Sequence, residues 1–138
     1  MRLRPVDEVV GQILDLVQSK RECETRSLDE ALNCCAAKDV YSPVDVPPAD
    51  NSAMDGYALA HKDANLEVNY VVSDRIPAGY VGEKLAFGSV ARIFTGALIP
   101  DGADTVVMQE NVLLTRGQVN LLELPKQFQN IRFKGQDI

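Results

Sequence analysis

Polar and small residues gather in the stretch PPADNSAMDGYA, residues 47–58. Asn51 and Ser52 have side chains that bond nearby backbone groups, so a turn that satisfies its own hydrogen bonds is one interpretation. Asp55 followed by Gly56 suggests chemistry, because glycine lets the backbone approach a bound group while the carboxylate points into the same space. Asp-Gly is also an ordinary turn signal. Both interpretations stay open at this point.

A second candidate lies in RIFTGALIPDGAD, residues 92–104, where an apolar run leads into Thr95 and Gly96 and then into a Pro-Asp-Gly turn. The exit of a strand into such a loop exposes backbone donors and one hydroxyl, which suits an anionic or phosphorylated ligand. The stretch has neither the lysine nor the glycine spacing of a P-loop. A Pro-Asp-Gly turn is sufficient by itself to explain its composition.

Acidic residues offer oxygen ligands for a divalent cation. Asp55, Asp104, Glu110 and Asp137 are a mixed set that suits Mg²⁺, although single carboxylates scattered through a sequence are weak predictors of a magnesium site and Glu110 is most simply a solvated acid. His61 is the only histidine and no CxxC pair is present. A zinc centre and a histidine-based catalytic triad therefore lack the residues they require.

The composition predicts a soluble, cytoplasmic protein. The 138 residues carry a formal net charge of −6, which argues against a nucleic-acid partner, because phosphate binding depends on clustered Lys and Arg. No apolar run is long enough to span a membrane, and the first residues carry charges where a signal peptide would be apolar. Among the three cysteines, Cys34 and Cys35 are expected to be reduced residues that pack in a helix.

The elements that must position these side chains are helical first and β-rich afterwards. Apolar residues at spacings of three and four predict an amphipathic helix over 6–20. Ser27 and Glu30 have the spacing of a capping box, which predicts a second amphipathic helix over 27–37.

From about residue 40 the sequence pattern changes from helical to extended. Prolines favour extended backbone, and short runs of β-branched residues follow. Strands are expected over 68–72, 90–94 and 105–109, and Arg116-Gly117 should form the tight turn of a hairpin between 112–115 and 118–122. These patterns predict an α+β fold with N-terminal amphipathic helices. A helical lead-in over residues 1–45 would precede a β-rich, barrel-like domain over 46–138.

Three stretches carry a resemblance to a known family. DNSAMDGYA, IFTGALIPDGADTVVMQE and the terminal NIRFKGQDI resemble, in that order, motifs of the molybdopterin molybdenumtransferases. These are the molybdenum insertases, which include bacterial MoeA and the E domain of gephyrin. The resemblance also takes in both predicted helices and therefore spans almost the whole chain. Three long motifs in the correct order are far more specific than any one of them.

The resemblance implies an enzyme that hydrolyses adenylated molybdopterin and inserts molybdenum from molybdate into the dithiolene, with a divalent cation such as Mg²⁺ assisting. By motif match, Asp55, Thr95 and Asp137 correspond to catalytic residues of the family. Asp55 and Asp137 would hold the cation or a water, and Thr95 would donate a hydrogen bond to an oxyanion. Substrate binding is expected at four neighbouring positions, which are Asn51, Ser52, Gly56 and Gly96.

The resemblance also implies what lies outside this sequence. In the family, a catalytic α/β domain and a further β domain follow the GQDI motif, and the active site forms between two subunits of a homodimer. This chain would then supply half of a site and be inactive by itself. Its other expected partner is the adenylyltransferase that makes the adenylated molybdopterin. The alternative is a noncatalytic module of the gephyrin type that dimerises or binds a partner.

Overall fold

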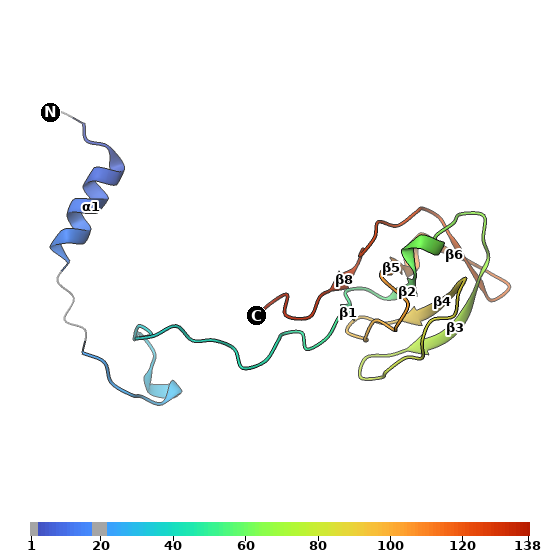
Figure 1. Ribbon diagram of the computed structural model, residues 1–138, viewed down its shortest axis with the longest axis horizontal. Coiled ribbons are helices and arrows are strands. Elements are labelled where there is room, and N and C mark those ends of the chain that lie inside the picture. Colours follow the sequence, from blue (N-terminus) through green and yellow to red (C-terminus); the bar gives the residue numbers. More distant parts are fainter. Residues whose placement is uncertain (1–2, 18–21) are drawn as a thin grey trace. The chain divides into compact units, whose positions relative to one another are not determined.

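The computed structural model describes residues 3–17 and 22–138. The chain divides into two units, Met1–Tyr41 and Ser42–Ile138, and each is described by itself. The described residues of the first unit form helix α1 and a 3₁₀ turn (Figure 1). The second contains all eight strands of the described residues. The predicted domain boundary after residue 45 stays a prediction.

Helix α1 runs from Val6 to Leu16. Pro5 precedes its first residue and two acids occupy its first turn, both of which suit a helix N-terminus because proline presets the backbone and acids complement the helix dipole. The helix ends because Val17 adopts extended backbone angles, φ −77° and ψ 95°. The predicted end at residue 20 lies outside the described residues. No residue of α1 is buried, so its apolar side chains contribute no packing within the described part of this chain.

The second predicted helix is wrong. Residues 27–37 form only a single 3₁₀ turn, η1, over Leu28–Glu30. The Ser27 hydroxyl donates to Glu30 at 2.9 Å, and neither side chain caps a backbone donor as a capping box would. Asn33 then takes a left-handed backbone, φ 66°, which ends any helical path. A short amphipathic segment needs a surface to pack on, and the described residues give Leu28 none, since it is 95% exposed.

The cysteine prediction fails for the same reason. Cys34 and Cys35 are exposed and lie in irregular backbone after the η1 turn, so they pack in no helix. Cys23 is also exposed, and all three are free thiols.

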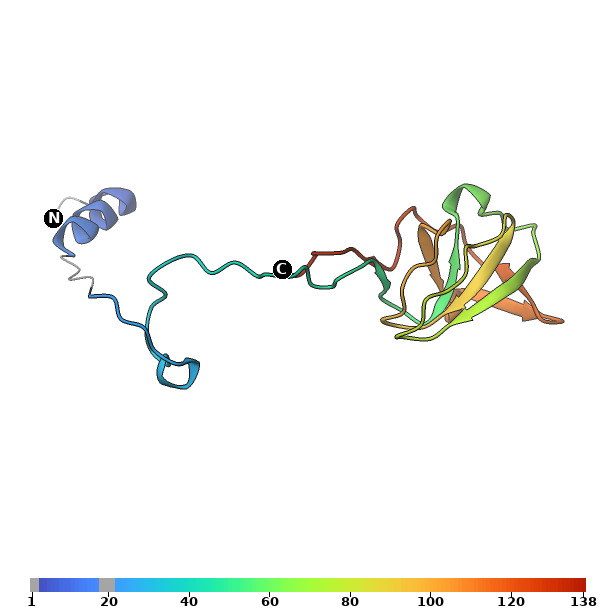
Figure 2. The same cartoon turned by 60° about the horizontal axis from the view of Figure 1, so that its bottom comes forward.

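The second unit is built on a six-stranded sheet with the order β5-β2-β4-β3-β7-β6. All its neighbouring strands are antiparallel except β3 and β4, which are parallel. Figure 2 shows the sheet curling into half a barrel. A separate pair joins β1 to β8. The strands are β1 Asn51–Ser52, β2 Gly56–Leu59, β3 Tyr70–Ile76, β4 Ser89–Ile93, β5 Thr105–Met108, β6 Val112–Thr115, β7 Gln118–Leu121 and β8 Ile131–Arg132.

The β-rich, barrel-like half of the fold prediction is confirmed. The predicted strand over 68–72 is displaced to β3, because its chain continues through a register shift between Val72 and Asp74. The strands expected over 90–94 and 105–109 match β4 and β5 within a residue at each end. The predicted hairpin is present as β6 and β7, and both of its turn residues have positive φ, 52° for Arg116 and 81° for Gly117.

Alternate residues of each strand pack into two apolar clusters, one on each face of the sheet. One cluster contains Tyr57, Leu59, Tyr70, Val90, Val107, Val119 and Leu121. The opposite face holds Ala58, Ile76, Ala91, Ile93, Ala97 and Val106. Both faces are therefore covered around β2, β4 and β5, and these three strands are packed from both sides.

Asp104 ties three segments of this scaffold together. Its carboxylate accepts the backbone N–H of His61 at 2.6 Å, the hydroxyl of Thr105 at 3.2 Å and the amide of Gln127 at 3.1 Å. Burial by itself raises the pKa of Asp104, but these hydrogen bonds favour the charged form and the pKa is lowered from the usual 3.8. The acid therefore stabilises the fold as a carboxylate.

This contact predicts a loss of stability in acid. Because the pKa of Asp104 is lower when folded than unfolded, its contribution is fully present above pH 3.8 and disappears as the pH falls through the folded value. Asp104→Asn should cost about 1–3 kcal/mol at neutral pH and should flatten the acid limb of stability against pH. Urea unfolding at several pH values measures both effects, with the exposed Glu83→Gln as the matched control. An unchanged acid limb in Asp104→Asn would contradict the assignment.

No helix among residues 3–17 and 22–138 has the length and apolar content needed to cross a membrane.

Candidate active site

Asp55 and Thr95 meet although 40 residues separate them in the chain. Asp55 lies in the connection between β1 and β2, and Thr95 lies in the loop that follows β4. Since β2 and β4 are antiparallel neighbours, with Gly56 opposite Ile93, the start of one strand and the end of the other coincide. The Oδ1 atom of Asp55 accepts both the backbone N–H and the hydroxyl of Thr95, each at 2.8 Å.

These contacts favour the ionised carboxylate of Asp55. The backbone N–H of Thr95 is the largest influence that lowers the pKa of Asp55, the Thr95 hydroxyl is the second, and the positive charge of Arg92 adds a smaller effect. Desolvation opposes them, but the pKa remains below the usual 3.8. Asp55 is only half-buried, so a charged oxygen is presented at the surface. Such a group can orient a water or a cation, and it can accept a proton.

Thr95 therefore acts on Asp55 in two separable ways. Replacing Thr95 with valine keeps the backbone N–H and the branched shape but removes the hydroxyl, so the pKa of Asp55 should rise toward its ordinary value. Thr95→Ser keeps the hydroxyl and should leave the pKa of Asp55 low. A pH titration of the Asp55 carboxyl carbon by NMR measures this, and equal values in the valine and serine variants would refute the hydroxyl contact.

The loop that carries Thr95 is held by Ser52. Phe94 to Ala97 form a tight turn, in which the N–H of Ala97 donates to the carbonyl of Phe94 at 2.9 Å and Gly96 takes φ 81°. The N–H of Gly96 donates to the carbonyl of Ser52 at 2.8 Å, and the N–H of Ser52 donates to the carbonyl of Ala97 at 2.9 Å. Glycine suits the third position of this turn because other residues rarely adopt positive φ.

The side chain of Ser52 is buried and faces its own turn. Its hydroxyl donates to the carbonyl of Met54 at 2.6 Å and accepts the N–H of Met54 at 3.3 Å. The turn interpretation of this residue is thus present in the structure. Direct contact of Ser52 with substrate stays a prediction, as does that of Gly96.

Asn51 lies beside this turn with an unusual side chain. Its backbone pairs with Arg132 of β8 and bridges to Leu98. Its Oδ1 atom is buried and accepts no hydrogen bond from the described residues. A buried oxygen without a donor is costly, so Asn51 has capacity to accept one from a water or a bound molecule.

Gly56 is required by packing. A Cβ atom at this position would lie 2.0 Å from the carbonyl oxygen of Val107 in β5, far inside van der Waals contact. The missing side chain lets β2 approach β5 where Asp55 leaves the sheet. The carbonyl of Asp55 also accepts the N–H of Gln109 at 3.1 Å, which holds the acid from both sides.

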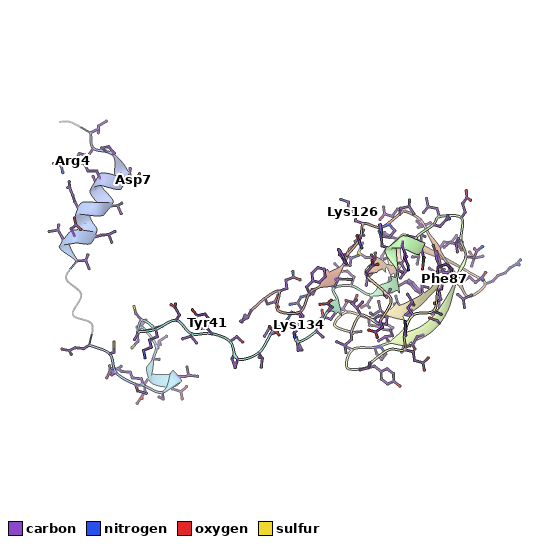
Figure 3. All side chains as sticks on the ribbon, in the orientation of Figure 1. Arg4, Asp7, Tyr41, Phe87, Lys126 and Lys134 are labelled. Carbon is purple, nitrogen blue, oxygen red and sulfur yellow. The ribbon has the colours of Figure 1, made fainter. Side chains whose placement is uncertain are left out.

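Asp137 occupies a different cluster. Its carboxylate forms an ion pair with Arg132, and its N–H donates to the carbonyl of Val46 at 2.9 Å. Lys134, labelled in Figure 3, forms a second ion pair with Asp45 at 3.1 Å. The GQDI motif is therefore tied to the segment that enters the β unit.

The structure brings Asp55 and Thr95 together but gives Asp137 no contact with either of them in residues 22–138. Asp104 is used by the scaffold hydrogen bonds described above, and Glu110 is exposed, as a solvated acid would be. Within the described ranges, no three residues of the types His, Cys, Asp and Glu gather as a possible metal ligand set.

Sequence reasoning missed the groups beside Asp55. Arg92 points from β4 toward the start of β2, where its guanidinium donates to the carbonyl of Gly56 at 3.1 Å and to the Oε1 atom of Gln109 at 2.6 Å. The same guanidinium lies 5.2 Å from the centre of the Tyr57 ring and 4.6 Å from that of Phe94. One signal was available, since a lone arginine within the apolar run SVARIF needs a special environment.

The sequence pattern of the family described as the MoeA N-terminal region, domains I and II, matches residues 4–138. This chain belongs to that family. A molybdopterin molybdenumtransferase of Haemophilus influenzae is 40% identical over 135 residues, which cover 96% of this chain and 33% of that protein. The molybdopterin molybdenumtransferase of a Nostoc species is 38% identical over 138 residues. The resemblance inferred from the three motifs is confirmed.

Solved structures agree with this assignment. The crystal structure of the molybdopterin biosynthesis moeA protein of Pyrococcus horikoshii aligns with this chain with a TM-score of 0.75 and 33% sequence identity. The aligned region covers 99% of this chain and 38% of the Pyrococcus horikoshii chain. The chain thus has a MoeA-like fold. It spans about a third of the length of the curated relatives it matches.

Proposed function

We propose that this chain is part of a molybdopterin molybdenumtransferase and supplies the Asp55 and Thr95 side of its active site. The observation that carries the proposal is the contact of these two side chains, which keeps a surface carboxylate ionised where β2 begins and β4 ends. The named activity of the relatives points the same way. The reaction would be hydrolysis of adenylated molybdopterin, with transfer of molybdenum from molybdate to the dithiolene.

In this proposal Asp55 orients the attacking water and accepts its proton, because its Oδ2 atom accepts no hydrogen bond from the described residues. Thr95 holds the other oxygen and keeps the acid charged. The Thr95 hydroxyl points its proton at Asp55, so it would donate to an oxyanion only after that bond is exchanged. Asn51 would contact the substrate through its unpaired oxygen, and Gly96 would let the backbone approach it. Gly56 would act through packing, because the space left by its missing side chain is filled by the carbonyl of Val107.

The residues also suit Mg²⁺, which commonly takes one or two protein carboxylates together with substrate phosphates. Asp55 would contribute the oxygen that Thr95 leaves free. Asp137 lies in a separate cluster with Arg132, so it would become a second ligand only if the GQDI segment moved toward Asp55. When bound, the cation would neutralise charge on the phosphate groups of the adenylate.

The proposal extends to partners. The exposed apolar side chains of residues 3–17 and 22–41 fit a homodimer, and the adenylyltransferase that supplies adenylated molybdopterin would be the upstream partner. A cytoplasmic location stays a prediction.

Reconstitution tests the proposed function. The 138-residue chain would be mixed with the following two-thirds of a MoeA relative, adenylated molybdopterin, Mg²⁺ and molybdate. Release of AMP together with active molybdenum cofactor is the expected result, while either half by itself should give neither. Binding of the two halves without release of AMP would overturn the enzymatic role.

One observation favours a second candidate function. No residue of α1 is buried, and Ile13, Leu14 and Leu16 are all exposed, so this face is available to another chain. A noncatalytic dimerisation or partner-binding module would use it. The reconstitution separates the two, because the module predicts association without turnover.

A further inference from the structure

Two arginines face each other across the parallel strands β3 and β4. Arg75 is the register partner of Arg92, and the two side chains lie on the same face of the sheet. Like charges directly opposite on neighbouring strands repel and destabilise the pair. An arrangement of this kind requires compensation from a nearby anion, an aromatic ring or a ligand.

No acid of the described residues supplies it through an ion pair to either guanidinium. The carboxylate of Asp74, the neighbour of Arg75 in sequence, is used by the backbone: it accepts the N–H of Arg75 at 2.6 Å and that of Glu83 at 3.0 Å. Asp55 is close enough to feel the charge of Arg92, but it forms no ion pair with it and is held by Thr95. Glu110 reaches Arg92 only through the amide of Gln109, which donates to the Glu110 carboxylate at 3.2 Å. In a chain of net charge −6, two guanidinium groups therefore lie together without an ion pair to any acid of the described residues.

An aromatic ring holds the two cations in place. The guanidinium carbon of Arg75 lies 4.5 Å from the centre of the Phe94 ring, and that of Arg92 lies 4.6 Å from it. Contact with the ring face offsets part of the repulsion and restricts both side chains. Phe94 directly precedes Thr95, so the two cations adjoin the Asp55 and Thr95 pair.

Most of the hydrogen-bond donors remain available. Arg92 uses two of its five N–H groups, on the carbonyl of Gly56 and on Gln109. The Arg75 side chain donates to no acceptor among the described residues, and it is exposed to solvent. Planar guanidinium groups with free donors match the oxygens of phosphate and similar tetrahedral anions.

We propose that Arg75, Phe94 and Arg92 form a cradle that binds a tetrahedral oxyanion, either a phosphoryl group or molybdate, beside Asp55 and Thr95. The inference rests on the proposed function only for its place in the reaction, where the cradle positions the anionic substrate for Asp55. The binding itself follows from two unpaired cations on one ring. The two positive charges of the cradle repel each other but both attract a bound anion, which turns a destabilising pair into a ligand site.

The test is a titration of the ¹⁵N-labelled 138-residue chain with inorganic phosphate and, separately, with molybdate, at constant ionic strength held with chloride. NMR resonances of the arginine side-chain Nε–H groups report the contact directly. Saturable shifts of the Arg75 and Arg92 resonances are expected with at least one anion. The anion whose binding saturates identifies the natural ligand. Saturation with phosphate indicates a phosphoryl group of the adenylated substrate, and saturation with molybdate indicates molybdate itself.

Arg75→Gln is the decisive variant, because Arg75 is exposed and makes no side-chain hydrogen bond that the fold requires. It should lower the affinity for the saturating anion about tenfold to a hundredfold. Arg75→Lys keeps the charge but loses the planar guanidinium, so its affinity for the anion should lie between that of the parent chain and that of Arg75→Gln. Arg116→Gln, on the exposed turn between β6 and β7, is the matched control and should bind as the parent chain does.

Three results would overturn the cradle. They are shifts that never saturate with either anion, shifts of equal size at Arg116, or unchanged affinity in Arg75→Gln. The proposed function fails separately, since the titration needs no turnover. If the anion binds saturably but the reconstituted protein releases no AMP, the cradle is supported and the proposed enzymatic function is contradicted. If AMP is released but Arg75→Gln binds the anion as tightly as the parent chain, the enzymatic function is supported and the cradle is contradicted.

Discussion

A Gly56→Ala variant should unfold at a clearly lower urea concentration than the parent chain, with about 3 kcal/mol of stability lost. The reason is the 2.0 Å approach between an added Cβ atom and the carbonyl oxygen of Val107. That oxygen belongs to the backbone of β5 and cannot rotate away as a side chain would. The methyl group could fit only if β2 and β5 separated, which would disturb the most tightly packed strands of the sheet.

Urea unfolding followed by tyrosine fluorescence measures this loss. Gly117→Ala is the matched control, because Gly117 has nothing within 4 Å of an added Cβ but has φ 81°. Its cost should be about 1 kcal/mol, from backbone strain without a clash. If both variants unfolded at the same urea concentration, the close approach of β2 to β5 would not be what Gly56 provides.

An Asp55→Asn variant should lose the proposed activity while keeping the fold. The amide has nearly the shape of the carboxylate, but it carries no charge and accepts no proton at neutral pH. Release of AMP in the reconstituted enzyme should fall about a hundredfold or more, as expected for a group that acts in proton transfer or orients the attacking water. The urea midpoint should change little, because the Asp55 side chain is half-buried, bonds only to Thr95, and leaves the backbone contact with Gln109 in place when it is replaced.

Glu83→Gln is the control for this loss, since it removes one exposed carboxylate of the same unit. It should release AMP at the parent rate. Normal turnover by Asp55→Asn would exclude Asp55 from the chemistry and leave the reaction to residues of the added MoeA portion. The Arg75→Gln variant adds a distinction, because a cradle defect should raise KM for the adenylated substrate before it lowers kcat.

Local sequence patterns predicted most strands of the β-rich unit correctly. The Arg116-Gly117 turn needs positive φ at both positions, and the alternating residues on either side define a hairpin without help from distant parts of the chain. β4 and β5 were found because their apolar runs are short and bounded by turn residues. The predicted second helix failed because a capping pair and an apolar stripe stabilise a short helix only when that stripe is buried.

The sequence by itself determined the family, the strands from β3 to β7 and the candidate residues, since the three motifs, the short apolar runs and the hairpin turn are each formed by residues close together in the chain. Only the tertiary structure decided which of those residues act together. Asp55 meets Thr95 because β2 and β4 are antiparallel, and Arg75 meets Arg92 because β3 and β4 are parallel. Strand pairing brings together residues that are far apart in the chain. The local sequence of a strand does not show which other strand will pair with it, or on which side.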